Sequence, residues 1–335
     1  MTAPPPPAPP TINMAHRRKL ARSAGPRQAA ATPRRVPPTR LLGRRWRLEK
    51  ELRRGPLVHI HAGSSAEGKD VMIRLLPVDT CARAAQERFI KAAMFLSGVD
   101  HPGLPEFEDF GYDAHARAYV LVTERCKGAT LSALMAHNTS MLGLHHVLTV
   151  GQRLASTLYA IHSEGMVHGD VAPGNIILRQ NNGVLRTRLF DLSTLRHVKG
   201  HSQHKEELWA TPGYMAPELI CDEPLTCSSD LYSLGALLYE MVSGAAPFVG
   251  SHAQVLRQHI LEEPIALERV WSLKAPVHDG LTQLVGRLLA KKPGARPGSA
   301  LEVWATLRAL RKEVQDPTLG RTGVSWRAVR PLSAP

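Results

Sequence analysis

The segment at residues 168–175 constrains this chain more than any other part of its sequence. It sets Asp170 and Asn175 five residues apart, a spacing that puts both side chains on one short loop facing a common cleft. A second aspartate, Asp191, and the pair Pro217 and Glu218 follow downstream. A His-x-Asp run in a surface turn can arise by chance, but this run together with the residues that follow it favours a functional loop.

Size and charge suggest one domain with a basic tail. The chain has 335 residues, of which 43% are hydrophobic, and this is near the practical limit for a single core. The net charge is +13, and residues 1–45 hold ten Lys and Arg side chains with no Asp or Glu. We therefore predict a mildly basic two-lobed body preceded by a basic leader.

The leader at residues 1–45 is rich in Pro, Ala and Arg. Such a segment cannot bury enough apolar surface to offset its ordering entropy, so we expect it to be disordered. Alternatives are a proline-rich ligand and a basic arm that docks an acidic partner. No aromatic residue lies among its arginines, so we expect no nucleic-acid binding. Met14 is an alternative translation start.

The cysteines and the hydrophobic runs bear on the expected compartment. The four cysteines have neither zinc-site spacing nor a disulfide pattern, which favours a reducing environment. No run of 18 apolar residues predicts a membrane span, and the N-terminus lacks the apolar core of a signal peptide. The expected location is the cytoplasm.

The periodicity changes along the chain. Strand-like patterns occupy most of residues 46–124, interrupted by a helical pattern at 82–97. From residue 131 the patterns are mostly helical, with amphipathic or apolar runs at 151–163, 229–243, 278–290 and 300–312. A small lobe of one sheet and one helix should therefore precede a helical lobe.

Across roughly residues 46–312 the sequence resembles the eukaryotic-like serine/threonine protein kinases, with a catalytic loop of bacterial flavour. The resemblance implies an α+β, bilobal fold with a small antiparallel N-lobe sheet plus one helix and a mostly helical C-lobe. By that resemblance Asp170 is the base that accepts the substrate hydroxyl proton. Asn175 and Asp191 hold Mg²⁺ against the phosphates of ATP. Thr211 hydrogen-bonds the catalytic aspartate.

The same resemblance divides the chain and assigns structural roles. It implies a leader at 1–45, an N-lobe at 46–124, a hinge and C-lobe at 125–312, and a tail at 313–335. Glu218 should pair with Arg296 inside the large lobe, and Asp230 should brace the backbone of the catalytic loop. Protein substrates or protein partners are expected.

The nucleotide base should lie against the linker between the lobes. By the resemblance, Thr123 is the gatekeeper residue, and the main-chain groups of Glu124 and Cys126 hydrogen-bond the adenine edge. Ile177 forms the floor below the ring. Gly55 of the loop above the phosphates and Arg74, where the family has lysine, complete the expected nucleotide contacts.

The loop and strand above the phosphates depart from the family pattern. The three glycines of the family loop align with Arg53, Gly55 and Val58, and Pro56 removes a backbone donor. Arg74 keeps a positive charge, but a guanidinium is larger than an ammonium and demands a planar partner. Met72 replaces a small alanine above the adenine.

Further departures remove charged groups. The glutamate that pairs with the family lysine aligns with Ala92, and the catalytic-loop arginine and lysine align with Gly169 and Ala172. Loss of a single electrostatic donor costs on the order of 10²–10³ in rate, so these changes predict a very slow enzyme. Arg74, Arg53 or Arg54 could restore the rate by taking over the phosphates.

Three functions therefore stay open. The first is an active, atypical serine/threonine kinase that binds Mg-ATP. The second is a pseudokinase that acts as a scaffold or allosteric regulator. The third is a small-molecule phosphotransferase of the aminoglycoside type, whose loops often read H-G-D-x-x-x-x-N. The peptide-receiving run at residues 210–218 argues against the third.

Overall fold

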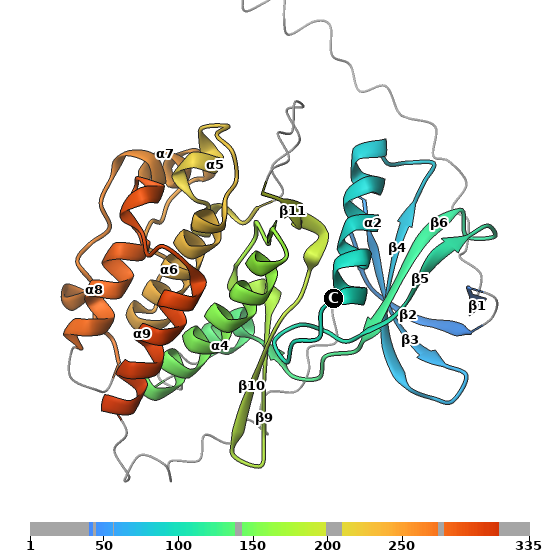
Figure 1. Ribbon diagram of the computed structural model, residues 1–335, viewed down its shortest axis with the longest axis horizontal. Coiled ribbons are helices and arrows are strands. Elements are labelled where there is room, and N and C mark those ends of the chain that lie inside the picture. Colours follow the sequence, from blue (N-terminus) through green and yellow to red (C-terminus); the bar gives the residue numbers. More distant parts are fainter. Residues whose placement is uncertain are drawn as a thin grey trace, which may run out of the picture. The chain divides into compact units, whose positions relative to one another are not determined.

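The computed structural model describes residues 40–42, 45–55, 57–137, 143–198, 210–273 and 278–314. In these residues an antiparallel sheet with one long helix comes first, and a mostly helical part follows (Figure 1). This is the α+β, bilobal fold that the resemblance implies, so that prediction is confirmed.

The N-lobe is a six-stranded antiparallel sheet with the order β1-β2-β3-β4-β6-β5. Helix α2 contacts β5 and β6. The elements of this lobe are β1 (Arg40–Leu41), β2 (Trp46–Arg54), β3 (His59–Ser65), β4 (Asp70–Pro77), α2 (Arg83–Gly98), β5 (Phe107–Asp113) and β6 (Ala118–Glu124).

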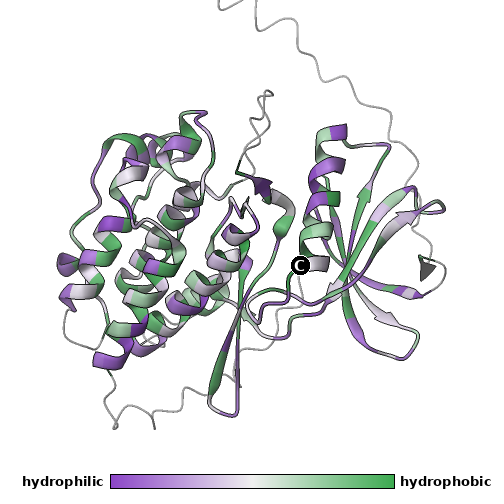
Figure 2. Cartoon of the chain, viewed as in Figure 1, coloured by the Kyte–Doolittle hydropathy of each residue, from purple (hydrophilic) through white to green (hydrophobic). Residues whose placement is uncertain are grey.

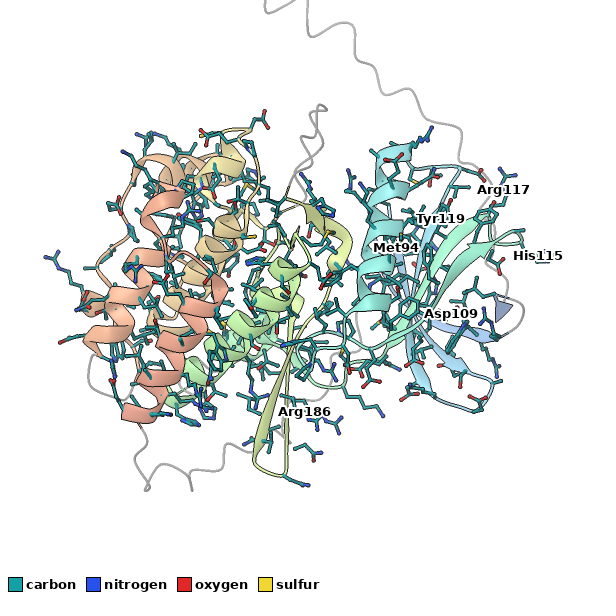
Figure 3. All side chains as sticks on the ribbon, in the orientation of Figure 1. Met94, Asp109, His115, Arg117, Tyr119 and Arg186 are labelled. Atoms are coloured by element: carbon teal, nitrogen blue, oxygen red, sulfur yellow. The ribbon has the colours of Figure 1, made fainter. Side chains whose placement is uncertain are left out.

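The two faces of this sheet bury different residues. Along β4, Val71, Ile73 and Leu75 join a small outer cluster, whereas Leu76 belongs to the main core. This follows from the alternation of side chains along a strand. The indole N–H of Trp46, a member of the outer cluster, donates to Asp109 Oδ2 at 2.6 Å. This hydrogen bond links β2 to β5. Figure 3 labels Asp109 in the N-lobe.

The C-lobe is built on three long helices that pack together. Helix α4 contacts both α6 and α9, and α6 contacts α8 (Figure 1). Helix α6 is buried along most of its length, as its apolar sequence predicts. The helices are α3 (Leu131–His137), α4 (Leu144–Ser163), α5 (Pro217–Ile220), α6 (Cys227–Ser243), α7 (His252–Leu261), α8 (Asp279–Leu288) and α9 (Ala300–Glu313).

Apolar residues gather where the C-lobe helices face one another, and polar residues cover their outer sides (Figure 2).

Short strands and turns connect the lobes to the site. The strands are β7 (Ala129–Thr130), β8 (Met166–Val167), β9 (Ile176–Asn181), β10 (Val184–Leu189) and β11 (Arg196–His197). The 3₁₀ turns are η2 (Pro173–Asn175), η3 (Leu192–Thr194), η4 (Pro212–Tyr214), η5 (Leu267–Arg269) and η6 (Pro293–Ala295).

Several predictions concern residues outside the described ranges. Residues 1–39 and 43–44 of the predicted leader, with its docking arm, lie outside them, as do Pro56 and residues 315–335 of the predicted tail. At the end of that leader, Arg40 and Leu41 pair with β2 as a two-residue strand. None of the helices in the described ranges is long and apolar enough to cross a membrane.

Candidate active site

The loop between β8 and β9 brings Asp170 and Asn175 into direct contact. The Asn175 amide nitrogen donates to Asp170 Oδ2 at 2.7 Å and to the Asp170 backbone oxygen at 3.0 Å. The backbone N–H of Thr211 donates to Asp170 Oδ1 at 2.8 Å. Both oxygens of the Asp170 carboxylate are therefore held, one from its own loop and one from a segment 41 residues away.

Asp230 of α6 fixes the backbone of this loop from below. Its carboxylate accepts the N–H groups of His168 and Gly169, each at 2.8 Å, and it is buried to 1% exposure. Gly169 has φ +80°, a left-handed conformation that glycine adopts without a Cβ penalty. The glycine therefore suits the turn that presents both N–H groups to Asp230. Asp230 thus contacts the backbone of the catalytic loop, the role that the resemblance implies for it.

A buried histidine accompanies the Asp230 carboxylate. His162 of α4 lies with its Nε2 2.9 Å from Asp230 Oδ2. Burial, the largest influence, lowers the pKa of His162, but the hydrogen bond and the charge of Asp230 outweigh it, with help from Cys227, and raise the pKa to about 9. His162 is therefore charged at neutral pH and pairs with Asp230 as a buried ion pair.

Asp191 reaches the same place from the end of β10. Its φ of +63° lies in the left-handed region, where a non-glycine residue is strained and often functional. The backbone N–H of the preceding residue, Phe190, donates to the backbone carbonyl oxygen of Asn175 at 2.9 Å, which links the two segments. Asp170, Asn175 and Asp191 line one cleft of about 480 Å³.

Arg74 does not line this cleft. It lies on β4 at 8% exposure, and its Nη1 donates to the Thr123 hydroxyl at 3.1 Å. Its Nε has no hydrogen-bond partner within the described part of the chain. Burial lowers the pKa of Arg74, and the Asp191 carboxylate opposes that shift. Arg74 lines a smaller cavity beside Ala92, where no carboxylate from α2 replaces the missing glutamate.

Comparison with known proteins agrees with this geometry. The model of the protein kinase domain matches residues 50–306. The chain belongs to the bacterial, eukaryotic-like serine/threonine protein-kinase family. It is 33% identical over 285 residues to the serine/threonine-protein kinase pkn2 of Myxococcus xanthus, covering 82% of this chain and 33% of that protein.

Two further relatives have the same character. The DNA damage-responsive serine/threonine-protein kinase RqkA of Deinococcus radiodurans is 31% identical over 276 residues, covering 81% of this chain and 41% of that protein. The serine/threonine-protein kinase PknA of Mycobacterium tuberculosis is 28% identical over 281 residues, covering 81% and 63%. The chain thus spans between a third and two thirds of the length of these relatives.

A buried ion pair fixes the kinase segment that follows Thr211. Arg296 bonds Glu218 through two contacts, Nη1 to Oε1 at 2.7 Å and Nη2 to Oε2 at 2.8 Å, as the resemblance predicts. The Ser229 hydroxyl also donates to Glu218 at 2.7 Å. Burial raises the pKa of Glu218, but the hydrogen bonds and charge of Arg296 outweigh it, so the pKa lies below its ordinary value.

The predicted adenine-binding residues lie at the linker between the lobes. Glu124 bonds Arg188 of β10 at 2.9 Å, which joins the linker to the C-lobe. Burial, followed by the neighbouring Glu124 charge, raises the pKa of the Cys126 thiol to about 12. Gly128, with φ +146°, passes so close to Leu178 that a Cβ on Gly128 would lie 2.3 Å from the carbonyl oxygen of Leu178. This crossing brings the linker over Ile177 of β9.

The cleft collects some of the predicted site residues and not others. Gly55, Asp170, Asn175, Asp191 and Thr211 line it. The residues predicted to contact adenine do not line this cleft: Thr123, Glu124, Cys126 and Ile177. Thr211 donates a hydrogen bond to Asp170 through its backbone N–H. The prediction did not specify which atom of the threonine makes this bond.

Sequence reasoning missed two arginines of this site. Arg88 of α2 and Arg196 of β11 line the cleft together with Arg53 of β2. The signal for Arg88 was its position one helical turn before Ala92, where the resemblance places the family's glutamate. Arg196 had no comparable signal, because it is brought near the loop only by the pairing of β11 with β8.

Proposed function

We propose that this chain binds Mg-ATP in the cleft and transfers its terminal phosphoryl group, slowly, to serine or threonine of a protein. The observation that carries the proposal is the convergence of Asp170, Asn175 and Asp191 on one cleft. Membership of the serine/threonine kinase family supports the reaction class. The substrate is inferred to be a protein because the segment from η4 to α5 is present and anchored by the Glu218–Arg296 pair.

The residues present fit a magnesium ion. The Asn175 amide nitrogen is committed to Asp170, which leaves its side-chain oxygen as the available ligand atom. With an Asp191 carboxylate oxygen on the same cleft, this is an all-oxygen set of the kind that Mg²⁺ shares with substrate phosphates. Bound there, Mg²⁺ supplies positive charge that neutralises the phosphate oxygens.

Asp170 is placed to receive a proton. Each oxygen of an ionised carboxylate can accept about two hydrogen bonds, so the contacts from Asn175 and Thr211 leave acceptor capacity on Asp170. Those contacts also prevent rotation of the carboxylate. In the proposed reaction Asp170 orients the substrate hydroxyl and takes its proton while the oxygen attacks phosphorus.

The reaction is proposed to be slow because the cations that the family places at the transferred group are replaced. Ala172 stands where the family has a lysine, and Arg74 is engaged with Thr123 rather than directed into the cleft. Positioning and charge stabilisation provide nearly all of the catalysis in phosphoryl transfer. Each missing donor is expected to cost on the order of 10²–10³ in rate.

A second function, that of a scaffold or allosteric regulator, rests on the N-lobe. Ala92 is buried at 2% exposure beside Arg74, so α2 has no carboxylate at that position to couple its placement to the nucleotide. A chain of this kind could bind a partner kinase without transferring phosphate. Nothing in the geometry favours a small-molecule phosphotransferase over these two.

The test has two parts. Thermal unfolding with and without ATP and Mg²⁺ measures binding, and labelled ATP with a generic serine-rich acceptor protein measures transfer. We expect a magnesium-dependent rise of the unfolding midpoint, and slow labelling that Asp170→Asn abolishes while the midpoint of the apoprotein is unchanged. Binding without labelling would favour the regulator. The absence of any shift would refute nucleotide binding, and equal labelling by Asp170→Asn would expose a contaminating kinase.

A further inference from the structure

A β-bulge in β2 decides which of two adjacent arginines, Arg53 or Arg54, faces the cleft. The pairing of β2 with β3 shifts register between Glu51 and Arg53. Without that shift the two residues, two apart in one strand, would point to the same face of the sheet. A bulge inserts one extra residue and re-aims the side chains that follow it.

The cross-strand rows show the result. Arg53 pairs with Ile60, which pairs with Arg74, and this row faces α2. Glu51 pairs with His61, which pairs with Ile73 of the outer cluster. Residues opposite each other in a sheet share a face, so Arg53 belongs to the cleft side. In agreement, both Arg53 and Ile60 line the cleft.

Arg54 is occupied on the opposite face. Its Nε donates to Glu51 Oε1 at 2.8 Å, and the two side chains form an exposed ion pair. Arg74 donates to Thr123 and lines the smaller cavity, together with Asp191, rather than the large cleft. Of the three arginines that the sequence offered as replacements for the family lysine, Arg53 alone lines the large cleft of the described residues.

Helix α2 supplies a second cation to the cleft. Arg88 is half-buried and lines it alongside Ala85 and Phe89, which belong to the same helix face. With Arg196, three arginines from three separate elements border a cleft that also contains Asp170 and Asp191. The guanidinium group stays charged at all relevant pH values and bonds phosphate through two parallel N–H groups.

From this placement we infer that Arg53 and Arg88 bind the polyphosphate of the nucleotide, in place of the lysine that the family uses on β4. The inference rests on the proposed binding of Mg-ATP and names the residues that provide its cationic contacts. Arg74 has a different role, because its hydrogen bond to the predicted gatekeeper Thr123 links β4 to β6. The positive charge for the phosphates thus comes from the loop strand β2 and from helix α2.

The test compares ATP with adenosine, which has the same base and sugar but no phosphate. Isothermal titration is carried out on the wild type and on Arg53→Gln and Arg88→Gln, with Mg²⁺ present. We expect each variant to bind ATP about 10- to 100-fold more weakly, the size of one lost charge-assisted hydrogen bond, and to bind adenosine as the wild type does.

Two matched controls come from the same elements. Arg54→Gln changes the next residue of β2, which faces away, and Lys91→Gln changes an exposed residue of α2. Both should bind ATP within twofold of the wild type. Arg53→Lys and Arg88→Lys, which keep the charge, should recover part of the lost ATP affinity, and a purely structural role would not give that recovery.

The outcomes separate the two levels of the proposal. If the wild type binds Mg-ATP and Arg53→Gln and Arg88→Gln bind it equally well, this inference is overturned while the proposed function stands. If they lose ATP and adenosine affinity together, the residues support the fold of the cleft and the inference is also overturned. If the wild type does not bind Mg-ATP, both fail.

Discussion

The two sides of the cleft hold their charged groups in opposite ways. On the C-lobe side the carboxylates of Asp230 and Asp170 have well-placed hydrogen-bond donors: Asp230 accepts two backbone N–H groups, and Asp170 is held by Asn175 and Thr211. On the N-lobe side the buried cation, Arg74, donates one hydrogen bond, to the neutral Thr123 hydroxyl, and its Nε has no hydrogen-bond partner in the described residues, although the Asp191 carboxylate acts on its charge.

This difference indicates which features of the kinase fold tolerate change. The Asp230 contacts fix the backbone of the loop, so their loss would disturb the fold as well as the site. In the proposed function the N-lobe cations contact only the nucleotide, so their charge can be supplied from another strand or helix. The C-lobe should therefore respond to substitution with large losses, and the N-lobe with modest changes in either direction.

The largest effect is expected where a buried charge loses its partner. Glu218→Ala would leave Arg296 buried at 4% exposure without its carboxylate. The expected loss of unfolding free energy is about 3–5 kcal/mol, measured by urea denaturation. Glu223→Ala, at an exposed glutamate nearby, should change it by less than about 0.5 kcal/mol. Similar losses in both variants would contradict the contrast between the lobes.

The ion pair of His162 predicts a dependence of stability on pH. Its pKa is raised to about 9, above the ordinary value of about 6.5, so its stabilising contribution is complete below pH 6.5 and disappears as the pH rises through 9. At its maximum the His162 ion pair contributes about 3 kcal/mol to the free energy of unfolding. Denaturation at pH 6 and pH 9.5 measures it, and His162→Gln should be less stable at pH 6 and lose less on going to pH 9.5.

A substitution in the N-lobe should produce a gain. Arg74→Lys combined with Ala92→Glu restores the ion pair that the family has between β4 and α2. We expect nucleotide affinity to rise about tenfold, or about 1.4 kcal/mol, in a titration with Mg-ATP. Ala92→Glu alone is the control, because it tests whether Arg74 can use the same carboxylate. An unchanged affinity in the double variant would direct attention to Met72 and the loop after β2.

An effect of similar size is expected at a single backbone position. Gly169→Ala adds a Cβ at φ +80°, 3.3 Å from the Leu225 side chain, and the left-handed conformation costs about 1–2 kcal/mol for an L-residue. Thermal unfolding should show a correspondingly lower midpoint. Gly174→Ala, in the same loop with no atom within 4 Å of its Cβ, provides the comparison and should be nearly neutral.

Much of this molecule could be predicted from local patterns. The spacing of Asp170, Asn175 and Asp191 identified the loop, and the apolar run at 229–243 identified a buried helix that begins at Cys227. Both predictions depend on residues close together in the sequence. The Glu218–Arg296 pair spans 78 residues and was recognised only through the resemblance.

The contacts that sequence reasoning missed depend on register and on distant packing. Arg53 and Arg54 are adjacent and chemically identical, and only the bulge before them decides which one faces the cleft. The bond between Arg74 and Thr123 joins residues 49 positions apart in antiparallel strands. No composition or periodicity reveals either arrangement, because a shift of one residue in a strand exchanges its two faces.

The thiol at the linker has a consequence for chemical probes of this kinase-family protein. Electrophilic inhibitors react with the thiolate form of cysteine, and the Cys126 thiol, with a pKa of about 12, has almost none of it at neutral pH. A covalent compound directed at this position would form its adduct slowly, although the residue lies beside the expected adenine site. Reversible ligands that reach the cations of β2 and α2 are the better starting point for a selective probe.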